Sequence, residues 1–316
     1  MLKPSELSEK EFELKMRNAI ESIPEEVRDR FIAMCLNSDQ LAAIVKEHEK
    51  AVKEIEIKYE KLYEPIYKER AEILAGNLAP SEENIQKFNQ KDQEIKDEEY
   101  EKLQVEVPDV SEVVDQPGIP GFWLQALKNH PVTKVHVFEN DFPILKHLLD
   151  VQLTLHEEGE GFELKFIFSE NEWMSNTELV KNYFLEDEEA PLPDKVESSA
   201  IEWKEGKNVT VKTISVKKKK KKKQKVEKEV EADSFFNFFK NHENPDEEVH
   251  DSEGEEAMAR MDDDWEIATA IKEDLLPLAL EYYLGVADDN IEDDMPPDDE
   301  ESEESDDSAK PKKKKK

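Results

Sequence analysis

Cysteine is almost absent from this sequence, which contains only Cys35 among its 316 residues. One thiol excludes a disulfide framework and a cysteine-rich zinc site within one chain, and it favours a reducing, intracellular compartment. Long hydrophobic runs are also missing, because residues 1–15 contain no apolar stretch and no segment approaches 18 uncharged apolar residues. We therefore expect no signal peptide, no membrane-spanning helix and no membrane partner.

The sequence also lacks the motifs of common catalytic sites. It has no glycine-rich phosphate loop and no nucleophile elbow, and its histidines do not have the spacing of metal ligands. Carboxylates are abundant, but among 79 acidic residues adjacent pairs are expected by chance. We therefore expect no enzymatic activity, no metal and no cofactor.

Negative charge is the dominant feature of the composition. The 79 acidic residues outnumber the 44 basic ones, the formal net charge is -35, and only 37% of the residues are hydrophobic. This apolar share is low for a globular protein, so one core domain with acidic, disordered segments is expected rather than two domains. Such a chain favours cationic partners over nucleic acid. The alternative is that the acidic runs only keep the protein soluble.

One long helix is predicted over about 40–74, where apolar residues recur at steps of three and four and form one seam. The seam consists of Val45, His48, Val52, Ile55, Tyr59, Leu62 and Ile66. Because lysine and glutamate flank this narrow seam, we expect a second copy to cover it, giving a homodimer through a parallel or antiparallel helix pair. The alternative is a helix that folds back on its own chain. Pro65 is expected to bend the helix near Lys61 without ending it.

The rest of the chain predicts an α+β fold, with an antiparallel β-sheet covered by helices. Helices are expected over 7–23, 27–36 and 141–149, with a short helix that follows a turn within 118–129 and a weak helix after Pro80. Period-two alternation predicts strands of one sheet over 151–156, 162–169, 179–185, 201–203, 209–216 and 226–230. The four phenylalanines in 235–239 are expected to be core, and an apolar helix over 265–284 that ends at Gly285 covers the sheet.

These elements divide the chain into five parts. We expect N-terminal helices over 1–36, a long dimerisation helix over 37–75, a polar accessory insertion over 76–117 and an α+β domain over 118–285. Residues 286–316 form an acidic C-terminal tail that ends in a lysine run. This tail has too few apolar residues to offset its ordering entropy, so it is expected to be disordered.

Four sequence blocks occur in a fixed order: YEPIY at 63–67, GIPGFWL at 118–124, WKEGKNVTV at 203–211 and SFFNFF at 234–239. Together they closely resemble the nucleosome assembly protein family of histone chaperones, from about 37 to 285. The resemblance implies an obligate homodimer through the long helix, an α+β domain at each end of the helix pair, and an acidic concave surface that takes core histones. The polar insertion favours this branch over the shorter SET-type branch. The tail over 288–307 departs from the family in having no aromatic residue.

The acidic runs are the candidate histone-binding residues, because their negative field accelerates association with basic proteins and weakens with salt. The segment 262–266 is the best candidate in the folded domain, although Trp265 within it is expected to be core. The candidate residues are Glu186, Asp187, Glu188, Glu189, Asp262, Asp263, Asp264, Glu266, Asp288, Asp289, Asp293, Asp294, Asp298 and Asp299.

A lysine run lies at the tip of a predicted hairpin and has the density of a nuclear import signal. It consists of Lys217, Lys218, Lys219, Lys220, Lys221, Lys222 and Lys223. A nucleic-acid patch is the rival interpretation, but no aromatic residues interleave the lysines. Ser252, Ser302 and Ser305 lie among acidic residues and are candidates for phosphorylation, which would add to the negative field.

We therefore predict a homodimeric histone chaperone that binds core histones through acidic surfaces and deposits them on DNA during nucleosome assembly. Its expected partners are core histones, a second copy of itself and a nuclear import receptor, without direct, specific nucleic-acid binding. It is expected to shuttle between the nucleus and the cytoplasm. The alternative is an acidic scaffold or transport adaptor that carries basic cargo without assembly activity.

Overall fold

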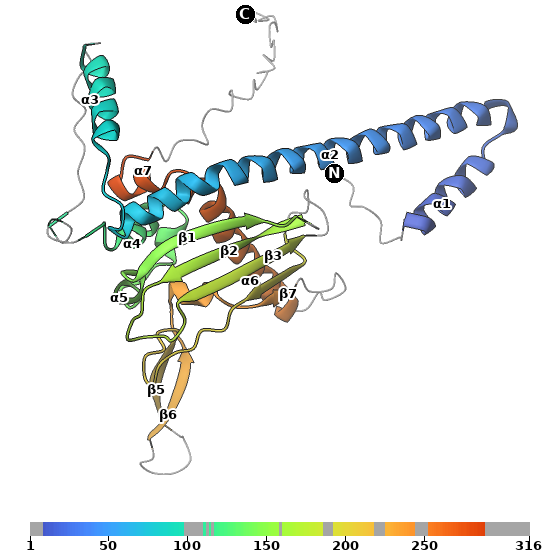
Figure 1. The fold of residues 1–316 in the computed structure, drawn as a ribbon. Helices are drawn as coiled ribbons and strands as arrows, with labels where there is room; N and C mark the ends of the chain where they lie inside the picture. Colours follow the sequence, from blue (N-terminus) through green and yellow to red (C-terminus); the bar gives the residue numbers. More distant parts are fainter. Residues whose placement is uncertain are drawn as a thin grey trace, which may run out of the picture.

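A long helix lies across a sheet domain in the computed structural model, which describes residues 9–97, 110–111, 114, 117–157, 160–185, 192–217, 225–243 and 252–287 (Figure 1). After α1 (Glu9–Glu21), the long helix α2 (Glu25–Leu74) has 50 residues and extends about 75 Å at 1.5 Å per residue. The prediction of a separate helix over 27–36 is wrong. No glycine or proline interrupts 25–64, so those residues form the first part of α2.

The helix α2 continues through Pro65, as predicted, and stops where Gly76 takes a positive φ of 76°. The backbone N–H of Ile119 then donates to the carbonyl of Leu74 over 2.8 Å, so both ends of the insertion meet at this point. A side chain at Gly118 would place its Cβ 2.1 Å from the Leu74 carbonyl oxygen, which explains the glycine. The helix α3 (Glu82–Asp97) therefore belongs to an excursion from the body (Figure 1).

The domain is built on an antiparallel sheet in the order β1-β2-β3-β4-β7. Its strands are β1 (Leu148–Leu155), β2 (Glu160–Phe168), β3 (Glu178–Leu185), β4 (Lys195–Ser198) and β7 (His242–Glu243). The first three confirm predicted strands, whereas β4 was not predicted because Val196 is its only buried residue. The helix predicted over 141–149 shortens to α5 (Phe142–Leu145), because Leu148 already pairs with Phe168 in the sheet.

The strands β5 (Val211–Lys217) and β6 (Lys225–Glu231) pair with each other as predicted, with Val216 opposite Val226. The prediction that they join the main sheet is wrong. They form a separate two-stranded ribbon that projects from one end of the domain (Figure 1). The strand predicted over 201–203 reduces to an isolated bridge between Trp203 and Met174.

Helices complete the core around the sheet. They are α4 (Phe122–Asn129), η1 (Thr133–Val135), η2 (Phe235–Phe238), α6 (Ser252–Ala270), the π-helical turn η3 (Ile271–Leu275) and α7 (Ala279–Leu284). The phenylalanine block is core, as predicted, and the ring of Phe166 on β2 lies 5.1 Å from that of Phe239. The single helix predicted over 265–284 is interrupted because Pro277 lacks an N–H, and Gly285 ends α7 at a φ of 70°.

Candidate interaction surfaces

One side of α2 is attached to its own domain by polar contacts. Lys53 pairs with Glu160 over 2.9 Å, and Lys61 pairs with Glu157 over the same distance. Between these two pairs, Glu60 accepts a hydrogen bond of 3.1 Å from the backbone N–H of Leu155. Burial raises the pKa of Glu60, and this hydrogen bond opposes the shift. These contacts fix the helix to the β1–β2 hairpin.

Arg70 secures the end of α2 that lies on the domain. Its Nη1 donates to the backbone carbonyl of Leu276 over 2.6 Å, and its guanidinium carbon lies 4.6 Å from the ring centre of Tyr67 and 5.0 Å from that of Trp123. Burial lowers the pKa of Arg70, while the nearby buried carboxylate of Asp150 acts in the opposite direction. A planar cation between two aromatic rings thus sets the position of α2 on the domain.

The predicted seam lies on another side of α2. At 3.6 residues per turn, its mean direction is about 150° around the helix from that of Lys53, Glu60 and Lys61, which contact the β1–β2 hairpin. Most of its apolar members are exposed, with fractions of 43% for Val45, 55% for Ile55, 46% for Tyr59, 54% for Leu62 and 63% for Ile66. His48 is also exposed, and Val52 is half-buried. The described part of the chain therefore leaves this seam largely uncovered, and the alternative of a helix folded back over it finds no support there.

The second candidate surface is the outer side of α6. Asp262, Asp263 and Glu266 are exposed there, as a surface that binds basic proteins requires. Asp264 requires a correction, because it is buried and its carboxylate is already bonded within the protein. Trp265 is half-buried, and its ring packs 5.6 Å from that of Phe162 and 5.5 Å from that of Tyr183. The segment therefore alternates surface acids with groups that attach α6 to the sheet.

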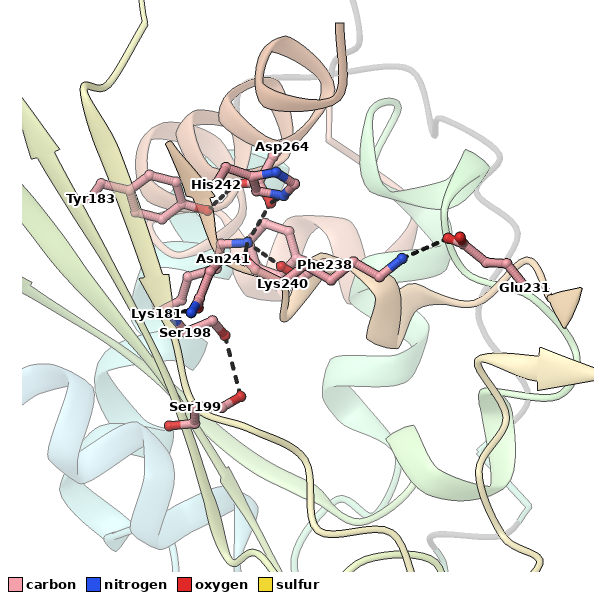
Figure 2. A network of polar contacts seen from close by, with 10 residues as sticks. All are labelled: Lys181, Tyr183, Ser198, Ser199, Glu231, Phe238, Lys240, Asn241, His242 and Asp264. Carbon is pink, nitrogen blue, oxygen red and sulfur yellow. Dashed lines mark hydrogen bonds and ion pairs between the residues drawn. The ribbon is translucent and has the colours of Figure 1, made fainter. Parts of the chain in front are cut away.

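Asp264 belongs to a buried ionic network between β3 and α6, which Figure 2 shows. The ammonium group of Lys181 bonds Asp264 Oδ2 and the backbone carbonyl of Phe238, and a third acceptor, the carbonyl of Lys240, lies at 3.4 Å. Tyr183 donates from its hydroxyl to Asp264 Oδ1 over 2.8 Å. His242 Nε2 lies 3.4 Å from Asp264 Oδ2. Every donor of the buried ammonium thus has an acceptor.

The burial of this network shifts the pKa values of Lys181 and Tyr183. Desolvation lowers the pKa of Lys181 to about 8, although the charge of Asp264 and its hydrogen bond act in the opposite direction. Desolvation, followed by the charge of Asp264, raises the pKa of Tyr183 well above its usual value. The network therefore holds a charged pair where burial disfavours each charge alone.

Lys181 and Tyr183 were not identified as important from the sequence. They occupy alternate positions of β3 with Leu179, and all three are buried on the same face of the sheet. A lysine at an inward-facing strand position was the available signal, because a buried lysine requires a partner of opposite charge. The identity of that partner is a tertiary fact, since Asp264 lies 83 residues along the chain.

Several predicted site residues lie outside the described part of the chain. These are the acidic residues 186–189, those of 288–299, Lys218–Lys223, Ser302 and Ser305. Lys217 is the last residue of β5, and the lysine run connects β5 to β6 along the chain. Ser252 is the first residue of α6.

Two kinds of site are absent from the described residues. No three histidine, cysteine, aspartate or glutamate residues in those ranges are grouped as a metal ion would require. Among the helices described, none has the length and apolar character needed to cross a membrane.

Comparisons with known proteins cover both candidate surfaces. The family model described as "Nucleosome assembly protein (NAP)" matches residues 30–286. Nucleosome assembly protein 1;2 of Arabidopsis thaliana is 34% identical over 247 residues, which are 76% of this chain and 61% of that protein. Nucleosome assembly protein 1-like 1 of Xenopus tropicalis is 36% identical over 290 residues, covering 87% of this chain and 73% of the relative. This chain thus spans less than two thirds of the plant relative's length.

The solved structure of Nucleosome Assembly Protein 1 from Plasmodium knowlesi is similar to the fold described above. It superimposes with a TM-score of 0.60 and is 27% identical, and the match covers 84% of this chain and all of that chain. Because the match covers 84% of this chain, it extends beyond the sheet domain alone.

Proposed function

Because this chain belongs to the nucleosome assembly protein family, we propose that it is a histone chaperone that binds core histones and deposits them on DNA. The observation that carries the proposal is the family match over 30–286, which includes both the apolar seam of α2 and the acidic outer side of α6. The names of its relatives refer to nucleosome assembly. Histones are basic, and a chain with a net charge of -35 attracts them.

The proposed mechanism is competition for the basic surface of the histones. The chaperone holds histones more weakly than a correctly formed nucleosome does, but more strongly than stray contacts with DNA do. Asp262, Asp263 and Glu266 contribute to the negative surface within the folded domain, and the acidic residues 186–189 and 288–299 add to its field. No nucleotide or covalent step is required, because the free energy of nucleosome formation drives release.

We also propose that the chaperone works as a homodimer through the seam of α2. In support, Ile55, Leu62 and Ile66 are each more than half exposed in the single chain, although they lie on one line of a helix about 75 Å long. The double variant Ile55→Glu/Leu62→Glu should be monomeric in sedimentation at micromolar concentration. The control variant Lys50→Gln/Lys87→Gln also replaces two exposed residues, and it changes the net charge by the same amount. It should remain dimeric. Equal masses for the two variants would contradict this interface.

Transport completes the proposal. The lysine run 217–223 would bind an import receptor, the protein would shuttle between nucleus and cytoplasm, and phosphorylation at Ser252, Ser302 or Ser305 would strengthen its negative field. A ribbon that projects from the domain supports this role for the run, because the run connects the two strands of that ribbon along the chain (Figure 1).

An assembly assay separates the proposed chaperone from an acidic transport adaptor. Relaxed plasmid, topoisomerase and purified core histones are mixed with the protein at physiological salt, and supercoiling is read on a gel. A chaperone should introduce supercoils in proportion to the histones supplied. Histone binding without any supercoiling would favour the adaptor and contradict the assembly function.

A further inference from the structure

A hollow of about 840 Å³ lies where the β2–β3 connection meets the segment that leads into β5. The backbone N–H of Ser175 donates to the carbonyl of Glu202 over 2.9 Å, and that of Lys204 donates to the carbonyl of Trp173 over 2.8 Å. One rim thus includes Lys204, which belongs to the block 203–211, one of the four blocks singled out in the sequence. Neither the seam of α2 nor the acidic side of α6 accounts for this block.

The walls of the hollow combine aromatic and acidic groups. The half-buried indole of Trp173 lies 5.7 Å from the imidazole of His147, whose Nδ1 is 2.8 Å from the hydroxyl of Ser169. Glu170 and Glu172, on either side of Asn171, also line the hollow, and both are exposed. An aromatic face beside a carboxylate is the arrangement that holds a cationic side chain.

A cation of the protein itself already occupies part of this arrangement. The ammonium of Lys207 lies 2.6 Å from Glu172 Oε2 and 5.4 Å from the ring centre of Trp173. The hydrogen bond and charge of Lys207 lower the pKa of Glu172. Both side chains keep contact with solvent, with exposed fractions of 38% for Lys207 and 63% for Glu172. An ion pair this exposed contributes little to stability, so another cation can replace it at small cost.

We propose that this hollow binds an arginine side chain of a basic polypeptide, and that Lys207 is an internal competitor for the same position. Arginine fits better than lysine because its planar guanidinium can stack on the indole of Trp173 and donate a hydrogen bond to each of the two carboxylate oxygens of Glu172. Lys204, on the rim, is engaged elsewhere, since its ammonium donates to the backbone carbonyl of Asn171 over 2.5 Å. The inference rests on the proposed function only in identifying the basic polypeptide as a histone.

Removal of the internal competitor provides a sharp test. A fluorescent, arginine-containing peptide of about 15 residues is titrated with the full-length protein at physiological salt, and its anisotropy gives the dissociation constant. Lys207→Ala should tighten binding by about two- to fivefold, the range that an exposed cation–π contact gives. Glu172→Gln should weaken it to a similar extent. Replacing every arginine of the peptide by lysine should remove the effect of Lys207→Ala.

A second ion pair of the same chain supplies matched controls. Lys240 pairs with Glu231 over 2.6 Å, with exposed fractions of 45% and 69%, and no aromatic contact of Lys240 is recorded within the described residues. Lys240→Ala and Glu231→Gln change the net charge by the same amounts as the test variants. If Lys207→Ala tightens binding no more than Lys240→Ala does, the effect is general electrostatics and the hollow is not a binding site.

The peptide titration is separate from the test of chaperone function. One outcome would overturn the arginine site alone. In that outcome the wild-type protein binds intact histones, and Lys207→Ala and Lys240→Ala do not differ in their affinity for the peptide. Failure to bind histones, together with a clear difference between the two lysine variants, would overturn the histone-binding function and leave the arginine site in place.

Discussion

Asp264→Ala should destabilise the protein strongly, because it removes the only carboxylate recorded in contact with the ammonium of Lys181 among the described residues. Lys181 would keep two backbone carbonyls as acceptors, and the hydroxyl of Tyr183 would lose its acceptor. Removing one partner of a buried ion pair typically costs about 3–5 kcal/mol. This is a large part of the 5–15 kcal/mol by which folded domains are usually stable.

Two further variants show whether the cost comes from the unpaired charge. Asp262→Ala removes an exposed carboxylate two positions away on α6, and it should change the free energy of unfolding by less than about 0.5 kcal/mol. Lys181→Met/Asp264→Leu removes both charges, so it should be more stable than Asp264→Ala alone. The hydroxyl of Tyr183 stays without its acceptor in the double variant, which leaves a cost of about 1–3 kcal/mol.

Urea denaturation at one fixed protomer concentration is the appropriate measurement, since association would otherwise shift the midpoint. Tryptophan fluorescence reports the transition, because Trp265 packs against Tyr183 next to the network. The reasoning is refuted if Asp264→Ala unfolds within about 1 kcal/mol of Asp262→Ala. It is also refuted if the double variant is less stable than Asp264→Ala.

The folded pKa of Lys181, about 8, lies below that of a free lysine, so the unfolded chain binds more protons between pH 8 and about 10.5. The free energy of unfolding of the wild type, relative to that of Lys181→Met, should therefore rise with pH in this window by at most about 1.4 kcal/mol per pH unit. Parallel urea titrations of the two proteins measure this difference. A difference that falls as the pH rises would contradict the assigned burial of Lys181. Gly161→Ala should lower the free energy of unfolding by more than about 3 kcal/mol, because the added Cβ would stand 1.9 Å from the carbonyl oxygen of Tyr183. In Gly206→Ala the added Cβ meets no atom within 4 Å, so this variant should lose only about 1–2 kcal/mol, for its positive φ. Equal melting temperatures for the two variants would refute this prediction. Replacing residues 77–117 by two glycines should remove the helical circular dichroism signal of α3 and leave that of the rest of the protein. It should not lower the melting temperature, because Gly76 and Gly118 already touch and a shorter loop has a smaller closure entropy. Loss of the remaining helical signal would show that the insertion supports the body.

The sequence predicted those parts of the fold in which local pattern and burial agree. In β2, alternate residues from Phe162 to Phe168 are buried, and the same alternation is visible in the printed sequence. The long helix was recognised because its lysine and glutamate residues favour helix and no glycine interrupts it. Its start was misplaced by 15 residues. The pattern of 27–36 is helical whether this segment is a separate helix or the first part of α2, and only the absence of a glycine or proline after it shows that the helix continues.

Other features depended on contacts that are distant in sequence. The strand β4 has a single buried residue, Val196, and it is fixed by pairing with β3 and β7 rather than by its own pattern. Asp264 looked like its exposed neighbours, because a run of three aspartates carries no local sign of which one faces inward. The hollow beside Trp173 was also not visible, since it requires the segments 169–177 and 202–207 to come together.

Sedimentation velocity of the purified protein, alone and with core histones at physiological salt, tests the central claim most directly. The account predicts a dimer of the 316-residue chain that takes up histones in a fixed ratio, with uptake that persists at physiological salt. A monomer would contradict the role of the α2 seam. Histone uptake that appears only at low salt would show that the attraction is nonspecific, and it would contradict a chaperone function.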